Sequence, residues 1–175
     1  SDLLGDYQIH NKKTVLQTVA VLNTQKEFRI SLENIQSGLL KVVKNTGLQG
    51  RWQQLGSLPK IICDTAHNKN GLEIVMKQIQ KETFHKLHIV LGVVNDKDLD
   101  DILPLFPKNA IYYFCKPNIP RGLDSLVLEQ KASEFDLKGK VYISVSEAYK
   151  TAISIAEKTD FIYVGGSTFV VAEIL

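Results

Sequence analysis

The chain has 175 residues, enough for one domain or for one domain with a piece of another. Hydrophobic residues make up 44% of it and charged residues 23%, so a sizeable core is available and overall disorder is excluded. The formal net charge of +2 favours neither nucleic acid nor an anionic membrane as a partner, and no apolar run approaches transmembrane length.

Cysteine and methionine positions bear on the origin of the chain. Cys63 and Cys115 lie in apolar, strand-like runs and match no zinc-binding spacing. We therefore expect buried free thiols and a reducing, cytoplasmic location. No signal peptide is present, and the only methionine is Met76. Because the sequence begins at Ser1, we expect it to be an expressed fragment of a longer protein.

Residues 1–47 are predicted to form helices followed by a linker at 44–47. The first helix places Val15, Leu16, Val19, Ala20 and Leu22 on one face, and Ser31 is a good N-cap for the second. Two short amphipathic helices cannot bury their apolar stripes against each other alone. The body that covers them is either the rest of this chain or a domain outside it.

From Gly50 onward the sequence alternates between strand and helix signals. A short strand is predicted at 51–55, with a turn at Gly56 and Ser57. Further strands are predicted at 61–63, 88–91, 111–115, 141–144 and 161–164, and helices begin near Asn68, Asp98, Ser125, Ser146 and after Ser167. Two of the expected helix faces are Leu99, Ile102, Leu103 and Phe106, and Tyr149, Ala152, Ile153 and Ala156. Apolar strands between helices indicate an α/β fold, a mainly parallel sheet covered by helices on both faces.

The polar loop after the strand at 61–63 is the first candidate site. Asp64 ends the apolar run, and His67 precedes the helix that starts near Asn68. Ligands of parallel α/β sheets bind outside the carboxyl ends of the strands, which is where these side chains fall. A carboxylate there can accept from both hydroxyls of a ribose, and a histidine near a helix N-terminus can donate to phosphate. The alternative is that Asp64 caps the helix and His67 is a solvated loop residue.

Polar loops are expected after three other strands at the same edge of the sheet, and Arg51 precedes the strand at 61–63. Arg51 can reach a polyphosphate, although it also suits a surface position over Trp52. Lys97 and Arg121 follow the next two strands, and Gly165-Gly166-Ser167 follows the last, where paired glycines let a carboxylate or phosphate approach the backbone. Neither a G-x-G-x-x-G nor a G-x-x-x-x-G-K-[ST] phosphate loop is present. If the protein uses ATP, the main phosphate cradle lies outside this chain.

The order of these motifs resembles the carboxy-terminal part of folylpolyglutamate synthase/dihydrofolate synthase, within the Mur ligase superfamily. The motif that carries the resemblance most specifically is Asp64-Thr65-Ala66-His67-Asn68, preceded by Gly50-Arg51-Trp52-Gln53. The other matching pieces are Gly5-Asp6-Tyr7-Gln8-Ile9-His10-Asn11, Asp96-Lys97-Asp98, Pro120-Arg121 and Gly166-Ser167. Together they span nearly the whole chain.

The resemblance implies an ATP-dependent ligase that phosphorylates a carboxylate to an acyl phosphate, which the amino group of L-glutamate then attacks. Residues 1–47 would be the helical tail of an upstream ATPase domain plus a linker, and residues 48–175 a Rossmann-like Mur ligase domain. The phosphate loop and the Mg ligands are expected upstream, so the chain alone would be inactive and holds no metal site. Folate and dihydropteroate both stay open as the acceptor.

The resemblance also implies roles for individual residues. Asn11 would lie at the adenine, Asp64 at the ribose, and Arg51 and His67 at the phosphates, with His67 as the catalytic residue. Ser167 and Gly166 would help to hold the glutamate. The segment Gly165–Val170 departs from the family's usual aromatic pattern, which bears on the glutamate end. Two alternatives remain: a nucleotide-binding α/β module of another enzyme class, and a non-catalytic binding domain.

Overall fold

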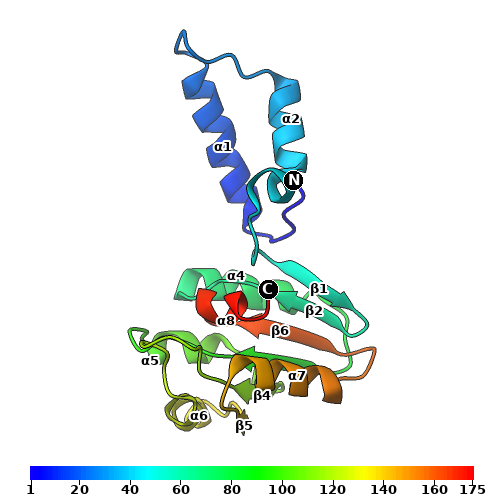
Figure 1. The fold of residues 1–175 in the computed structure, drawn as a ribbon, viewed down its shortest axis with the longest axis vertical. Helices are drawn as coiled ribbons and strands as arrows, with labels where there is room; N and C mark the ends of the chain where they lie inside the picture. Colours follow the sequence, from blue (N-terminus) through cyan, green and yellow to red (C-terminus); the bar gives the residue numbers. More distant parts are fainter.

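The computed structural model describes residues 1–175 and consists of an α/β body with a helical segment standing away from it (Figure 1). The helical segment contains α1 (Gln8–Leu22), α2 (Leu32–Leu40) and α3 (Val42–Thr46). Ser31 caps α2 as predicted, because its hydroxyl accepts from the Asn34 backbone N–H while the Asn34 side chain accepts from the Ser31 backbone. Both long helices point away from the sheet (Figure 1).

The body is built on a six-stranded sheet with the order β1-β2-β6-β3-β4-β5. Its strands are β1 (Gln53–Ser57), β2 (Lys60–Cys63), β3 (Leu87–Leu91), β4 (Ile111–Phe114), β5 (Gly139–Val141) and β6 (Phe161–Gly165). All neighbours pair in parallel except β1 and β2. The central strands β3 and β6 are buried at every position, which explains why they read as continuous apolar runs.

Helices cover both faces of this sheet. One core cluster includes side chains from α4 (Lys69–Ile79), α5 (Leu99–Ile102), the 3-10 turn η1 (Leu103–Leu105) and α6 (Ser125–Ser133). The other includes side chains from α7 (Val145–Ile155) and α8 (Thr168–Ala172). The predicted fold class, a mainly parallel α/β sheet preceded by a helical segment, is confirmed.

Three predicted boundaries are wrong. The first strand is shifted from 51–55 to 53–57, because Trp52 has a φ of 49° that no strand residue adopts and the pairing with β2 continues through Ser57. The strand expected at 141–144 is β5 at 139–141, since Ser144 already caps α7. The expected linker at 44–47 is partly helical: α3 runs to Thr46 and ends at Gly47, whose φ is 66°.

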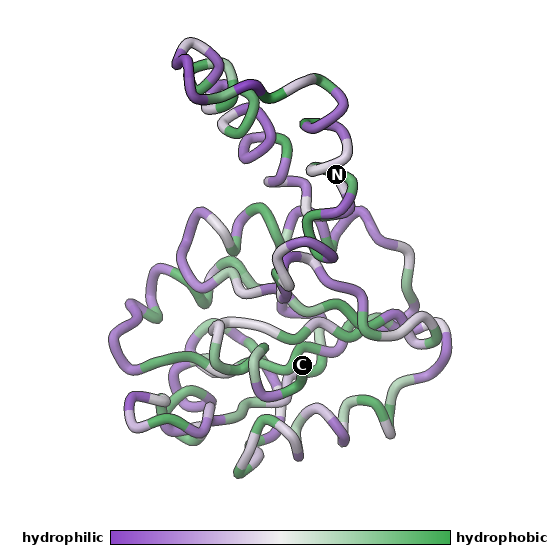
Figure 2. The backbone as a smooth tube through the Cα atoms, turned by 45° about the horizontal axis from the view of Figure 1, so that its top comes forward, coloured by the Kyte–Doolittle hydropathy of each residue, from purple (hydrophilic) through white to green (hydrophobic).

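Two predicted helix faces also differ from the structure. α7 buries Val145, Ala148 and Ala152, whereas Ile153 is 38% exposed and points away from the core. In α1 the expected apolar stripe is mostly uncovered, and Val15 and Leu16 are exposed. Figure 2 shows hydrophobic stretches in the helical segment although it stands away from the sheet. The rest of this chain is therefore not the body that buries the stripe.

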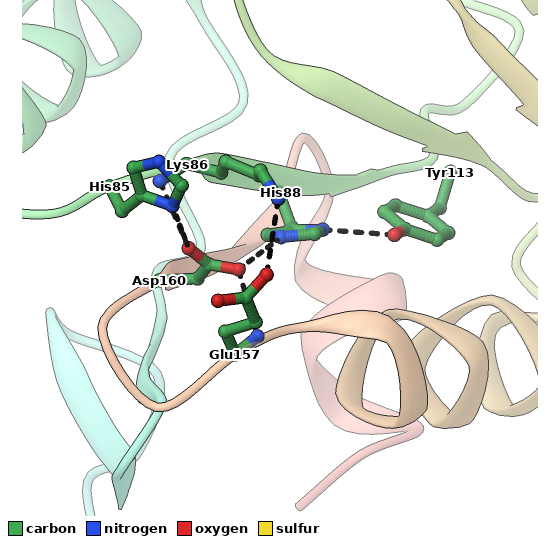
Figure 3. A network of polar contacts seen from close by, with 6 residues as sticks. All are labelled: His85, Lys86, His88, Tyr113, Glu157 and Asp160. Atoms are coloured by element: carbon green, nitrogen blue, oxygen red, sulfur yellow. Dashed lines mark hydrogen bonds and ion pairs between the residues drawn. The ribbon is translucent and has the colours of Figure 1, made fainter.

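A buried polar network lies where β3 and β6 begin, at the opposite end of these strands from the Asp64 loop (Figure 3). His88 contacts Asp160 Oδ2 through Nε2 at 3.2 Å and the Tyr113 hydroxyl through Nδ1 at 2.9 Å. Asp160 also accepts from the backbone N–H groups of Lys86 and Glu157. Cys63 and Cys115 are buried free thiols, as predicted. No helix is both long and apolar enough to cross a membrane.

Candidate active site

Asp64 immediately follows β2 and is 1% exposed. Its carboxylate accepts three hydrogen bonds from the protein. Oδ2 accepts from the Tyr7 hydroxyl and from the Trp52 backbone N–H, both at 2.7 Å, and Oδ1 accepts from the Ala66 backbone N–H at 2.8 Å. The side chain is thus held in one orientation by donors from three segments of the chain.

The turn at Gly50–Trp52 explains why a G-R-W sequence precedes this loop. Gly50 has a φ of 68°, and a Cβ there would lie 2.7 Å from Cγ2 of Thr65, so only glycine fits. Its carbonyl accepts from the Thr65 backbone N–H at 2.9 Å. The left-handed conformation of Trp52 then directs its N–H onto Asp64. Arg51, between them, is brought to the rim of the same cleft.

Tyr7 reaches Asp64 from the start of the helical segment. The neighbouring Asp6 is anchored on α4 and the turn after it: its backbone N–H donates to Gln78 Oε1 at 2.7 Å, and its carboxylate pairs with Lys81 at 2.6 Å. Gln78 also donates to the Leu4 carbonyl at 3.2 Å. These contacts fix the approach of Tyr7, whose ring packs against the larger core cluster.

The electrostatics of Tyr7 and Asp64 favour a protonated phenol that donates to the carboxylate. Burial raises the pKa of Asp64 above its ordinary value, and hydrogen bonds from Tyr7, Ala66 and Trp52 and the charge of Arg51 offset only part of this rise. Burial, followed by the charge of Asp64, raises the pKa of Tyr7 well above its ordinary value. The Tyr7 hydroxyl therefore stays protonated at neutral pH.

His67 lies just before α4, with one ring nitrogen already engaged. Its Nδ1 is 2.9 Å from the Thr65 carbonyl oxygen, and because a carbonyl only accepts, Nδ1 carries the proton. The free Nε2 therefore donates only when the ring is an imidazolium. Asn68 caps α4 by accepting from the Gly71 backbone N–H, so the alternative in which Asp64 caps this helix is wrong.

These side chains line one cleft of about 210 Å³. Its lining residues are Tyr7, Arg51, Asp64, Thr65, Ala66, His67, Asn68, Gly71 and Thr168. Arg51 takes part in none of the salt bridges of the structure, so its guanidinium is free to pair with a ligand. A free cation beside a helix N-terminus is suited to binding phosphate.

A second cleft, of about 340 Å³, shares His67 and Thr168 with the first. Its other lining residues are Val94, Asp96, Lys97, Arg121, Ser167 and Phe169. Arg121 is brought there by pairing between loops: its carbonyl accepts from Asn95 N–H, and Gly122 bridges to Val94. Asp96 lies 3.9 Å from Lys97 and 3.5 Å from Arg121. Two cations with one carboxylate suit a ligand that carries carboxylate groups.

The structure brings most of the predicted site residues together, but not all of them. Arg51, Asp64 and His67 share the first cleft, and Ser167 lines the second, where its hydroxyl caps α8 by accepting from Phe169 N–H. Gly166 is buried behind the clefts with a φ of 91°. Asn11 lines neither cleft; it is exposed on α1, and its amide donates to Gln8 Oε1.

Two lining residues were not singled out from the sequence. Tyr7 lies inside the Gly5–Asn11 motif, but nothing local indicates that its hydroxyl reaches a residue 57 positions away. Thr168 follows the Ser167 cap directly, and only the meeting of β2 and β6 in the sheet places it beside His67. Sequence spacing within one loop cannot reveal either contact.

The geometry is that of an α/β ligand site at the carboxyl ends of parallel strands, with a phosphate-type cleft beside a carboxylate-type cleft. Residues 50–168 match the family described as Mur ligase, glutamate ligase domain. The chain belongs to this family.

Named relatives and solved structures agree with this assignment. A probable bifunctional folylpolyglutamate synthase/dihydropteroate synthase of Haloferax volcanii is 31% identical over 175 residues, 98% of this chain and 20% of that protein. The structure of Escherichia coli FolC in complex with DHPP and ADP is 26% identical, with a TM-score of 0.73 over 84% of this chain and 34% of that one.

Folylpolyglutamate synthase of Mycobacterium tuberculosis, complexed with ADP and AMPPCP, is 25% identical to this chain. Its TM-score of 0.80 extends over 97% of this chain and 39% of that one, so the helical segment is included in the match. The chain therefore spans between 20% and 39% of the lengths of these three proteins.

Proposed function

We propose that this chain supplies the nucleotide and glutamate contacts of an ATP-dependent ligase that adds L-glutamate to folate or dihydropteroate. The observation that carries the proposal is the pair of clefts that share His67 and Thr168. Support comes from the relatives: solved neighbours hold ADP and DHPP, and one folylpolyglutamate synthase/dihydrofolate synthase holds Mn, AMPPNP and L-glutamate. ATP, the pterin acceptor and glutamate are thus the proposed ligands here.

In the proposed reaction an acceptor carboxylate attacks the γ-phosphorus of ATP, giving an acyl phosphate and ADP. The glutamate amine then attacks the acyl carbon, and phosphate leaves. Within the first cleft Asp64 accepts from the sugar, while Arg51 and His67 face the phosphates. In the second, Lys97, Arg121 and Ser167 bind glutamate. His67, between the clefts, contacts phosphate oxygens whose charge changes during transfer.

We further propose that residues 1–47 form the tail of an ATPase domain and the linker, and that residues 48–175 form the glutamate ligase domain. The exposed apolar side chains of α1 support this division, because the α/β body leaves them uncovered. No group of three or more His, Cys, Asp or Glu side chains is placed to hold a metal ion. No step is therefore assigned to a metal on this chain, and the Mg ligands are proposed to lie in the ATPase domain.

Steady-state kinetics of the complete ligase, with ATP varied at saturating acceptor and glutamate, test the proposal. Asp64 contacts hydroxyls that do not react, so Asp64→Ala should raise the KM for ATP with a modest effect on kcat. His67 acts where charge develops, so His67→Ala should lower kcat by about ten- to a thousand-fold. An unchanged kcat in His67→Ala would contradict the proposed contact between His67 and the phosphates.

Matched controls separate site effects from folding effects. His10→Ala and Asp136→Ala remove the same side-chain types at exposed positions outside both clefts, and both should leave the kinetics unchanged. Asp64→Ala also leaves three donors without their acceptor, so its thermal unfolding must be measured alongside. Assays with folate and with dihydropteroate as the acceptor distinguish the two synthase activities.

A further inference from the structure

The hydrogen-bonding capacity of Asp64 is nearly exhausted by the protein itself. An ionised carboxylate offers about four lone-pair positions on two oxygens. On Oδ2, the Tyr7 hydroxyl and the Trp52 N–H occupy both positions, and the Ala66 N–H occupies one position on Oδ1. One acceptor position, on Oδ1, is therefore left for a ligand.

None of the three donors is free to leave. Trp52 N–H is directed by the left-handed turn after Gly50, and Ala66 N–H comes from the next residue but one in the same loop. Tyr7 follows Asp6, whose backbone is bound by Gln78 of α4 and whose side chain is bound by Lys81, two residues after α4. The phenol ring also packs on the core, so its hydroxyl cannot swing away without breaking these contacts.

A ribose presents two neighbouring hydroxyls, and a carboxylate with both oxygens free can accept from both. We propose that Tyr7 restricts Asp64 to one of them, which makes Tyr7 a specificity-determining residue for the nucleotide sugar. The inference rests on the proposed placement of the sugar at Asp64. Tyr7 lines the same cleft as Asp64, so its hydroxyl occupies the place that the second sugar hydroxyl would need.

The consequence is tolerance of one kind of deoxynucleotide. A hydrogen bond from a sugar hydroxyl to a charged carboxylate contributes about a tenfold or larger factor in affinity. Removing the hydroxyl that reaches Oδ1 should therefore weaken nucleotide binding by this factor. The other meets at most the neutral Tyr7 oxygen, a weaker partner, and its removal should change the affinity by less than about threefold.

Calorimetric titration of the complete ligase with ADP, 2′-deoxy-ADP and 3′-deoxy-ADP measures both factors without hydrolysis. In the wild type, one analogue should bind about tenfold or more weakly than ADP, and the other within about threefold of it. In Tyr7→Phe, the second position on Oδ2 opens, so both analogues should bind about tenfold or more weakly than ADP. Tyr142→Phe removes a phenol that makes no hydrogen bond and lines neither cleft, and it should keep the wild-type pattern.

Different outcomes test the inference about Tyr7 and the proposed nucleotide site at Asp64 separately. If both analogues bind the wild type at least tenfold more weakly than ADP, or if both bind as well as ADP, the inference is overturned. Tyr7→Phe showing the wild-type pattern removes the role of the Tyr7 hydroxyl. If Asp64→Ala binds ADP with unchanged affinity, the sugar is not at Asp64 and the proposed nucleotide site itself fails. Should Tyr7→Phe not fold, equal binding changes for the two analogues in the wild type would still overturn the inference.

Discussion

Asp64 shows how a carboxylate can be buried and still keep an acceptor position open for a proposed ligand. Removing its charge from water is costly, and three hydrogen bonds from Tyr7, Trp52 and Ala66 offset that cost while fixing the direction of the remaining lone pair. A side chain oriented in this way loses little rotamer freedom when a ligand binds. The bonds that stabilise the loop are therefore the same bonds that prepare it for binding.

Gly166 packs against other residues of the fold and lines neither cleft. Gly166→Val should destabilise the protein by on the order of 3 kcal/mol, because its φ of 91° is strained for valine. A Cβ there would also lie 2.6 Å from Leu91 Cδ1 and 2.8 Å from the Gly92 carbonyl oxygen. Thermal and denaturant unfolding measure the loss. Gly38→Ala is the matched control, since a Cβ at Gly38 meets nothing within 4 Å, and its stability should be equal or slightly higher.

Gly166→Val also separates two explanations of the paired glycines. The direction of the missing Cβ points toward β3 and not toward a ligand, so we expect the requirements for ATP and for glutamate to change together. A large rise in the KM for glutamate alone, with normal unfolding, would instead show that Gly166 approaches the substrate, as expected from the sequence.

At the scale of elements, the network around Asp160 joins β3 to β6 (Figure 3). Burial alone would raise the pKa of Asp160, but hydrogen bonds from Glu157 N–H, His88 and Lys86 N–H outweigh it and hold that pKa below its ordinary value. A depressed pKa means that the folded protein favours the ionised form. This contribution to stability is present above about pH 3.9, the ordinary pKa, and is lost as the pH falls through the folded value.

Asp160→Asn should therefore cost on the order of 2 kcal/mol at pH 7, because the neutral amide accepts from these donors less strongly. The difference from the wild type should shrink as the pH falls below about 4. Urea unfolding at a series of pH values measures it. Asp136→Asn, at an exposed aspartate paired with Lys108, should change little, and a constant difference for Asp160→Asn across the series would contradict the argument.

The order of elements in the body could be predicted because its central strands are apolar and each of the helices α4 to α8 has an N-cap side chain. β3 and β6 read as strands since both of their faces are buried, and Ser144 and Asp98 begin helices as N-caps. Errors arose where tertiary contacts decide. The left-handed Trp52 delays β1 because Asp64 takes its N–H, and no local pattern reports that contact.

The candidate site was predictable in part for the same reason. Asp64, His67 and Arg51 follow strands or turns whose ends meet at one edge, so topology alone brings them together. Tyr7 enters from the far end of the chain, and its partner could not be inferred from spacing. The role of Asn11 at the adenine stays a prediction taken from the resemblance, since in the structure this residue lies outside both clefts.

At the scale of the whole molecule, the helical segment and the body are joined mainly by polar contacts, and Tyr7 adds an apolar contact with the larger core cluster. Asp6 binds α4, Tyr7 binds Asp64, and the apolar side chains of α1 and α2 include several that are more than 40% exposed: Ile9, Val15, Leu16, Val21, Leu32 and Leu40. Such a surface is expected to be covered by another part of the proposed complete ligase. The proposed ATPase domain fits that position, because α1 leads away from the loop that is proposed to contact the nucleotide.

The division of labour between the two parts predicts that this chain alone releases no ADP from ATP in the presence of acceptor and glutamate. Phosphoryl transfer depends on a phosphate cradle and metal ions that stabilise the transferred group, and no cluster of metal-binding side chains occurs here. Arg51 and His67 are proposed to supply part of the phosphate contacts, so weak binding of ADP is still expected. A coupled assay of the 175-residue chain measures ADP release, with the Asp64→Ala chain as a control for contaminating ATPases. Release that requires glutamate and is lost in the control would mean that the chain is catalytic by itself.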